Sequence, residues 1–368
     1  MCASVRYVKS RSTSSDQLSM PRKEVAMNNR FCSIALALFP LLLGSCGDIP
    51  SPEKSVSESS EADSGMEDTM RELITDRNFE TGFDLMTTST ENGRTVSRTL
   101  DYGGEAKKTE SRPWKMAQWW TPFDFANAPM QKTDAGSYIY ENESRVLEVN
   151  PKKGSIMLQL NSYKEYMEKF GHSRVGTENW SHFLIEQDFV DAPKLTDLKH
   201  VYVHLKFRIF PNNDLDPDQA IPCSQITWYF TITDVRNGDT GYQSGNNDND
   251  FFWFGLPIFD SRYPFLSPYQ HVDSGFVGAT NRLIYSLGSD TYFDTPVQVG
   301  EERILELDIL PYIKQAYLYG FDHGAMQNSS WDRLVLNYMN LGWELPGSFE
   351  SGITISELSV RIERRDAK

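Results

Sequence analysis

The sequence predicts an all-β fold, a two-sheet antiparallel β-sandwich or jelly roll with short helices, on three observations. Apolar and polar residues alternate in many segments after residue 114, which is the period of a β-strand with one buried face. Turn clusters such as Pro211-Asn212-Asn213-Asp214 separate these segments. Few segments have the residue spacing of an amphipathic helix. Roughly ten strands with so little helix favour two packed antiparallel sheets.

The clearest strand covers residues 201–209, where apolar and polar residues alternate without a break. Its apolar residues point to one face of the sheet and its polar residues to the other. Helices are expected at 161–170 and at 311–319, the second beginning with a proline that suits a first helical turn. Further strands are expected at 79–85, 137–141, 145–149, 155–160, 183–189, 226–234, 251–259, 282–287, 303–310, 333–339 and 353–362.

A charge-free apolar run from Phe31 to Leu43 predicts a secretory signal peptide over residues 27–45. A helix of this length would reach about 20 Å, short of the ~30 Å hydrocarbon core of a membrane. Met27 is a better start than Met1, because a basic residue and the apolar run follow it closely. Residues 1–26 are therefore interpreted as an over-extended start of the sequence.

The apolar run ends in Leu43-Gly44-Ser45-Cys46, which resembles the lipobox of bacterial lipoproteins. The resemblance implies that Cys46 is lipidated and becomes the new N-terminus. The protein would then be anchored in the bacterial cell envelope, at the outer membrane or cell surface. The alternative is an ordinary signal peptide followed by a chance cysteine. Cys2 and Cys32 lie within residues 1–45 and Cys46 would be lipidated, so we expect Cys223 to remain alone, as a buried structural thiol.

Residues 46–72 are rich in Ser, Glu and Asp, and this composition predicts a disordered acidic tether. Residues 73–368 are expected to form a single β-sandwich domain. The whole chain has 36 Lys and Arg against 51 Asp and Glu, a net charge of -15. Without residues 1–45, which carry six basic and two acidic residues, the remainder has a charge of about -19. This acidity argues against a nucleic-acid partner, because phosphate binding needs an excess of Lys and Arg.

A lipobox, an acidic tether and aromatic-rich strands together resemble the envelope lipoproteins with which bacteria capture or degrade polysaccharides. The segments Trp343–Gly347 and Ile353–Val360 look like the closing strands of concanavalin-like or jelly-roll carbohydrate modules. The resemblance covers residues 80–360 in general shape. It implies a polysaccharide as partner and no required cofactor.

The polar face of the 201–209 strand is a candidate catalytic site for a polysaccharide lyase. Arg208 or Lys206 could neutralise a uronate, while Tyr202 and His204 could serve as acid and base in β-elimination. Jelly-roll lyases resemble this set in residue types, but their arginine-rich, Gln-x-His and Tyr-Phe-Lys-Ala-Gly motifs are absent. The alternative is that these residues form the solvated face of an outer strand.

A glycoside hydrolase would need two carboxylates that flank the bond to be cleaved. Glu306 and Asp308 share one strand face and resemble half of the Glu-x-Asp-x-x-Glu pattern of laminarinase-type enzymes. Pro311 stands where the second Glu is expected, which makes the hydrolase the weaker alternative.

Tryptophans are the candidate sugar-stacking residues, because their broad apolar faces keep a polar edge in contact with water. Trp119 and Trp120 lie in a loop-like segment, and Trp253 lies in an aromatic strand, so these three are predicted to contact the glycan. The acidic loop between residues 234 and 251 has the oxygen ligands of a structural calcium site, with Asp239, Asp248 and Asp250 as candidates. The same composition also suits a long polar hairpin loop.

The leading hypothesis is therefore a lipid-anchored cell-envelope protein that recognises an extracellular polysaccharide through one face of a β-sandwich. The alternative is a polysaccharide lyase that uses Tyr202, His204 and Arg208. A glycoside hydrolase or a protein-binding adhesion lipoprotein is a weaker alternative. The sequence leaves open whether the protein is an enzyme, although a lyase is favoured over a hydrolase.

Overall fold

The alternating segment at residues 201–209 lies within the longest strand, β10 (Leu198–Asp214). Its apolar side chains from Val201 to Ile209 are buried, whereas the polar side chains between them keep contact with solvent. β10 pairs antiparallel with β17 (Phe349–Arg364) along one edge and with β15 (Glu302–Asp308) along the other. The period-two prediction for this strand is confirmed.

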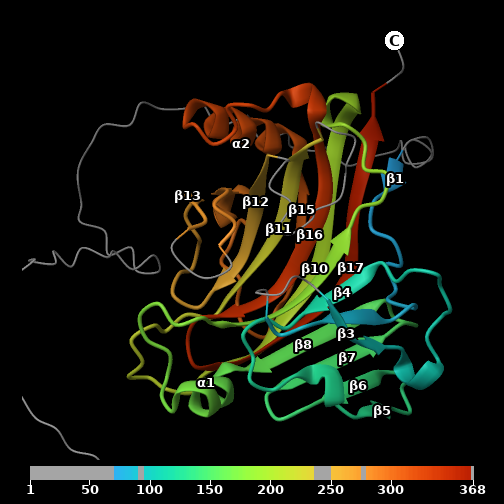
Figure 1. Ribbon diagram of the computed structural model, residues 1–368, viewed down its shortest axis with the longest axis vertical. Helices are drawn as coiled ribbons and strands as arrows, with labels where there is room; N and C mark the ends of the chain where they lie inside the picture. Colours follow the sequence, from blue (N-terminus) through green and yellow to red (C-terminus); the bar gives the residue numbers. More distant parts are fainter. Residues whose placement is uncertain (1–69, 90–94, 236–249, 275–278, 366–368) are drawn as a thin grey trace, which may run out of the picture. The chain divides into compact units, whose positions relative to one another are not determined.

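The computed structural model describes residues 70–89, 95–235, 250–274 and 279–365, all within the second of the two units into which the chain divides, Leu42–Lys368. The strands form two sheets (Figure 1). Sheet A has the order β15-β10-β17-β8-β7-β6-β5, with β1 beside β17. Its other strands are β8 (Ser155–Asn161), β7 (Arg145–Asn150), β6 (Tyr138–Glu141), β5 (Met130–Lys132) and β1 (Met70–Glu72).

Sheet B has the order β13-β14-β12-β11-β16-β9-β4-β2-β3. Its strands are β13 (Tyr269–Val272), β14 (Leu283–Ser286), β12 (Phe251–Asp260), β11 (Gln225–Asp234), β16 (Leu334–Leu345), β9 (Ser181–Asp188), β4 (Trp114–Ala117), β2 (Phe83–Met86) and β3 (Val96–Leu100). Among these strands only the β12–β14 and β2–β4 pairs are parallel. The inner faces of the sheets share one hydrophobic core, so the predicted two-sheet β-sandwich is confirmed.

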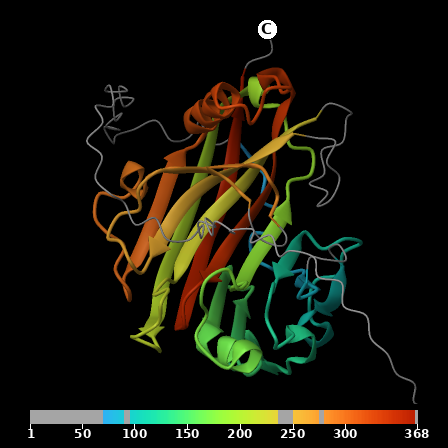
Figure 2. The same cartoon turned by 60° about the vertical axis from the view of Figure 1, so that its left-hand side comes forward.

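Two α-helices complete the described part of the chain, and both were predicted. In α1 (Ser162–Phe170), the Asn161 side chain caps the first turn by accepting a hydrogen bond from the backbone N–H of Lys164. Helix α2 (Leu310–Asp322) starts with a proline in its first turn and buries its apolar face in the core. Figures 1 and 2 show the two helices at opposite ends of the long strands.

Several large or reactive side chains are buried in or beside the hydrophobic core. Trp114, Trp228 and Trp343 are fully buried between the sheets. Cys223 is a free, buried cysteine, and its burial raises the pKa of the thiol. The prediction that Cys223 is a structural thiol rather than a nucleophile is therefore supported, because a nucleophilic cysteine needs a lowered pKa.

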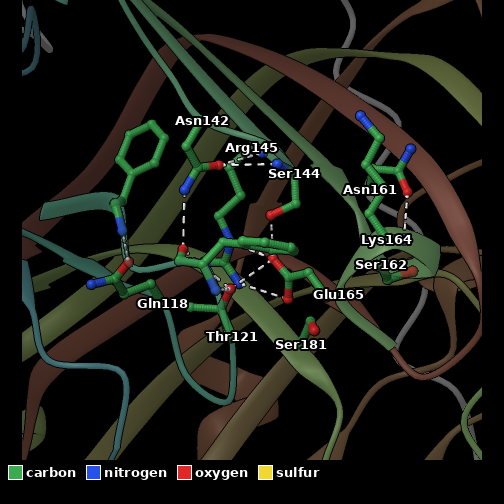
Figure 3. A network of polar contacts seen from close by, with 12 residues as sticks. Gln118, Thr121, Asn142, Ser144, Arg145, Asn161, Ser162, Lys164, Glu165 and Ser181 are labelled. Carbon is green, nitrogen blue, oxygen red and sulfur yellow. Dashed lines mark hydrogen bonds and ion pairs between the residues drawn. The ribbon is translucent and has the colours of Figure 1, made fainter. Parts of the chain in front are cut away.

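An ion pair is buried at the end of the sandwich where α1 lies. Arg145 of β7 donates to Glu165 of α1 from Nε at 2.8 Å and from Nη2 at 3.3 Å, and both side chains are fully buried. Glu165 also accepts hydrogen bonds from the hydroxyls of Ser144, at 2.7 Å, and Thr121, at 2.9 Å (Figure 3). Burial alone would raise the pKa of Glu165, but Arg145 and the Ser181 and Ser144 hydroxyls hold this pKa below its ordinary value.

The predicted leader at 27–45 and most of the predicted tether at 46–72 lie outside the described residues. The first described strand, β1, occupies the last three residues of that tether and pairs with the end of β17. No helix in the part of the chain that the structure describes is long and apolar enough to span a membrane.

Replacing Glu165 by Gln should destabilise the fold by about 3–5 kcal/mol, because the charge of Arg145 would stay buried without its partner. Urea unfolding followed by tryptophan fluorescence measures the change. Glu306→Gln is the matched control, since the Glu306 side chain is 70% exposed and its loss should matter by less than about 1 kcal/mol. Equal effects of the two substitutions would contradict the role assigned to the buried pair.

Candidate functional site

The polar residues of β10 lie together on the outer face of sheet A, but carboxylates from the neighbouring strands already surround them. The His204 ring lies between two glutamates, with Nδ1 2.7 Å from Glu306 and Nε2 3.4 Å from Glu357. Lys206 Nζ lies 2.9 Å from Glu302 and 3.6 Å from Glu357. The hydrogen bond to Glu302 raises the pKa of Lys206. A uronate at this face would meet more negative than positive charge.

The remaining members of the predicted lyase site have structural contacts. The Arg208 guanidinium lies over the ring of Phe210, 5.7 Å from its centroid. Tyr202 stacks on His200 at 5.1 Å, and burial raises the pKa of its hydroxyl, which works against a role as a base. These contacts favour the alternative of a solvated outer strand, and the catalytic roles of Tyr202, His204 and Arg208 stay a prediction.

The carboxylates proposed for a hydrolase are likewise engaged with histidines on this face. Glu306 contacts His204, as described above, and Asp308 accepts from His200 Nδ1 at 2.6 Å. Asp308 also accepts a hydrogen bond from the backbone N–H of Val201, which fixes the end of β15 against β10.

The predicted calcium ligands fall largely outside the described residues, which include neither Asp239 nor Asp248. Asp250 is described, and it forms an ion pair with Arg282 at 2.6 Å. Within the described ranges no group of three or more His, Cys, Asp or Glu side chains is placed to hold a metal ion. Calcium binding therefore stays a prediction.

The outer face of sheet B carries a different set of side chains, which the strand register brings into rows. Lys115, Glu186, Asn340, Tyr229 and Gly255 are successive cross-strand partners on β4, β9, β16, β11 and β12. Residues directly opposite each other share a face of the sheet, so this set forms one continuous row.

Two parallel rows lie on either side of it. The first joins Asp188, Tyr338, Thr231, Trp253 and Ile284, and the second joins His182, Glu344, Gln225 and Asp260. Leu184, Gly342 and Thr227 are cross-strand partners on the same face, between the central row and the second row. The residues that alternate with the row members along each strand point into the core. The face is therefore polar and aromatic across strands from β9 to β12, and β14 adds the aliphatic Ile284.

Aromatic rings gather around Trp253 at one side of this face. Trp253 meets Tyr229, Phe251 and Tyr338 in edge-to-face contacts with centroids 5.8–6.1 Å apart. Its indole N–H donates to the hydroxyl of Thr280 at 3.2 Å. Trp253, Tyr229 and Phe251 are half-buried, so some surface of each side chain is exposed.

Two glutamates lie on the same face in different settings. Glu186 is fully buried and accepts a hydrogen bond from the Tyr338 hydroxyl at 2.6 Å. Glu344 is partly exposed and accepts from the amide of Gln225 at 3.1 Å. Glu344 is four residues along β16 from the partner of Glu186, a rise of about 13 Å along the strand. Glycosidases hold their two carboxyl groups within about 5–9.5 Å, so the register alone does not bring these two into that arrangement.

The other side of the face is built around His182 and two tryptophans. The Trp180 ring stacks on His182 at 5.6 Å, and the Trp119 ring meets it edge-on at 5.4 Å. The N–H at Nδ1 of His182 donates a hydrogen bond to the carbonyl oxygen of Trp180 at 2.9 Å, and Nε2 lies 4.0 Å from Glu344 Oε2. Burial lowers the pKa of His182, although Glu344 acts in the opposite direction.

The three tryptophans predicted to contact a glycan lie in different places, and only two of them belong to the outer face of sheet B. Trp119 and Trp253 both belong to the outer face of sheet B, on opposite sides of it. Trp120 has a left-handed backbone (φ 67°), and the Lys169 ammonium lies over its ring at 5.9 Å. Sequence reasoning missed Glu186, His182 and Glu344. The alternation Thr227, Tyr229, Thr231 in β11 was the local signal that sheet B has a polar outer face.

Comparisons with known proteins concern the fold alone. No protein-family model matches the sequence, and no curated protein matches it. An endoglucanase from Rhodothermus marinus is 11% identical, covering 65% of this chain and 97% of its own, with a TM-score of 0.36. A family 12 xyloglucanase from Bacillus licheniformis is 11% identical, covering 64% and 97%, with a TM-score of 0.37. A family 11 xylanase from Neocallimastix patriciarum is 10% identical, covering 64% and 95%, with a TM-score of 0.31.

Acidification should weaken the fold in part through His182. Its pKa is lower in the folded chain than in the unfolded chain, so the unfolded chain takes up the proton more readily as the pH falls. The stability contributed by neutral His182 is fully present above about pH 6.5 and is lost below it. Urea unfolding at about pH 7.5 and 5 should therefore show a smaller loss for His182→Gln than for the wild type. His271→Gln, an exposed control on β13, should lose as much as the wild type; a full loss in His182→Gln would contradict the assignment.

Proposed function

We propose that the protein binds a polysaccharide along the outer face of sheet B. The observation that supports this proposal most directly is the set of three cross-strand rows, in which half-buried aromatic rings and hydrogen-bonding side chains lie together. Sugar rings present C–H faces that pack on aromatic rings and hydroxyls that need hydrogen-bond partners. The face offers both across strands from β9 to β12, a width that suits an oligosaccharide segment better than a single sugar.

The charges on this face favour a neutral glycan. Four described cations on the strands of this face or near their ends pair with aspartates at 2.5–2.8 Å: Lys115 with Asp188, Arg262 with Asp260, Arg282 with Asp250 and Arg333 with Asp234. Glu186 and Glu344 add negative charge near the centre. An acidic polysaccharide would therefore be repelled, whereas uncharged hydroxyls can donate to the carboxylates.

Cleavage by β-elimination is the alternative, and it rests on Tyr202, His204 and Arg208 on the opposite sheet. Glu302, Glu306 and Glu357 lower the capacity of that face to hold a uronate. Sheet B brings aromatic rings and hydrogen-bonding side chains together on one face, whereas glutamates surround the polar residues of β10 on sheet A. We therefore favour binding on sheet B over β-elimination on sheet A.

The protein would act at the bacterial cell envelope, at the outer membrane or cell surface, held by lipid on Cys46. This part of the proposal rests on the sequence alone, on Leu43-Gly44-Ser45-Cys46 after an apolar run. An acidic segment between Cys46 and the first strand would hold the sandwich away from the membrane.

Trp253→Ala should weaken polysaccharide binding about tenfold or more, because an interfacial tryptophan commonly contributes about 2 kcal/mol. Affinity gel electrophoresis of the full chain in neutral and acidic polysaccharides measures the retardation, and neutral gels should retard it more. Phe210→Ala is the control, since Phe210 is a 64% exposed aromatic residue on sheet A. Equal weakening by both substitutions, or release of an unsaturated uronate with ultraviolet absorbance, would contradict binding on sheet B.

Expression in a bacterium with an alkyne fatty acid should label the wild-type chain and place it in the membrane fraction. Cys46→Ser should lose the label, because only a thiol at that position fits the lipobox. Cys223→Ala should keep it, since Cys223 is buried in the sandwich. A label that persists in Cys46→Ser would refute the anchor.

A further inference from the structure

His182 and Glu344 form a pair of hydrogen-bond acceptors on the outer face of sheet B. Nδ1 of His182 lies 2.9 Å from the carbonyl oxygen of Trp180, so in the neutral ring this nitrogen holds the proton and Nε2 carries a lone pair. Nε2 faces Glu344 Oε2 at 4.0 Å, which is too long for a hydrogen bond. No side chain within the described ranges donates to Nε2 of His182 or to Oε1 of Glu344.

These two neighbouring acceptors need hydrogen-bond donors, and the donors must come from outside the protein. Both side chains are largely covered, with 10% of His182 and 17% of Glu344 exposed, so bulk water is a limited source of donors. Gln225 donates to Glu344 Oε2 and fixes that carboxylate in place, at 3.1 Å. The pair is therefore a rigid arrangement that can be satisfied by two donor groups close together.

The surroundings of the pair define which donors fit. Trp180 and Trp119 border His182 with ring centroids 5.6 and 5.4 Å away, so apolar ring surface adjoins the acceptors. An ammonium group could donate to both acceptors, but the neighbouring rings of Trp119 and Trp180 favour a ligand ring that packs on them and carries donors at its edge. A sugar with hydroxyls on adjacent carbons has this form.

We propose that His182 Nε2 and the Glu344 carboxylate accept hydrogen bonds from two neighbouring free hydroxyls of one sugar ring seated beside Trp119 and Trp180. The proposal rests on the polysaccharide binding proposed above and names its specificity-determining residues. A ring with those hydroxyls acetylated or methylated has no donors to offer, and a carboxylate there would be repelled by Glu344. The ligand is therefore a neutral polysaccharide with unsubstituted neighbouring hydroxyls.

The test compares one neutral polysaccharide in its native and O-acetylated forms, with the full chain and affinity electrophoresis. The wild type should prefer the unmodified form about tenfold or more. His182→Phe keeps the ring on Trp180 but removes the acceptor, and Glu344→Gln removes the charge with little change of shape. In both variants the preference should fall towards one. Trp253→Ala should weaken binding of both forms equally and leave the preference unchanged.

The outcomes separate this inference from the proposed function. If the wild type binds both forms equally, or if both variants keep the preference, the subsite is refuted while polysaccharide binding stands. If the wild type is retarded by neither the neutral nor the acidic polysaccharides, both proposals are refuted. Glu344→Gln covers the case in which His182→Phe fails to fold, because Glu344 is the more exposed of the two.

Discussion

The buried ion pair between Arg145 and Glu165 is the interaction on which the position of much of the sandwich depends. It joins β7 of sheet A to α1, and through the Thr121 hydroxyl it fixes the loop that carries Trp119. The Arg145 guanidinium also lies over the ring of Phe183 on β9, 5.0 Å from its centroid. A buried charge pair of this kind adds little net stability compared with apolar residues, but each partner penalises any arrangement that separates it from the other. The main effect of this ion pair is therefore to fix the positions of β7, α1 and the loop that carries Trp119.

The binding face depends equally on strand register. A slip of one residue in β16 would turn Glu344 into the core and bring Trp343 out to solvent. Gly342 keeps this region close-packed, because a Cβ there would lie 2.3 Å from the carbonyl oxygen of Phe183 on β9. The pairing of β9 with β16 thus requires glycine two residues before Glu344. Polar side chains on the outside of sheet B stay aligned because apolar side chains on its inside permit only one register.

Local pattern was enough to predict the architecture and most of the long strands. β10 and both helices were recognisable because their alternation or spacing extends over many residues. Strands such as β4, β5 and β13 span only three or four residues, too few for a period to show, and they were missed. The expected strand at 333–339 stopped short of Glu344, although β16 continues to Leu345.

The candidate face was harder to predict, because it is assembled from residues far apart in the chain. Trp119 and Trp253 were singled out as aromatic residues, but nothing local shows that they share a face. Glu186 lies in a predicted strand, yet its neighbours Tyr338 and Lys115 come from strands that pair with β9 only in the folded chain. Conversely, the residues of β10 formed the most regular pattern in the sequence, and the carboxylates that neutralise them arrive from β15 and β17.

The place of β17 in the sheet has a consequence for how the chain is made. It is the last described strand, yet it lies inside sheet A, with β10 along one edge and β8 and β1 along the other. β16, just before it, is likewise interior to sheet B. Both sheets therefore lack a central strand until the ribosome has nearly finished the domain. A chain without β16 and β17 can close neither sheet, so we expect the two sheets to form late and together, after both strands have been made.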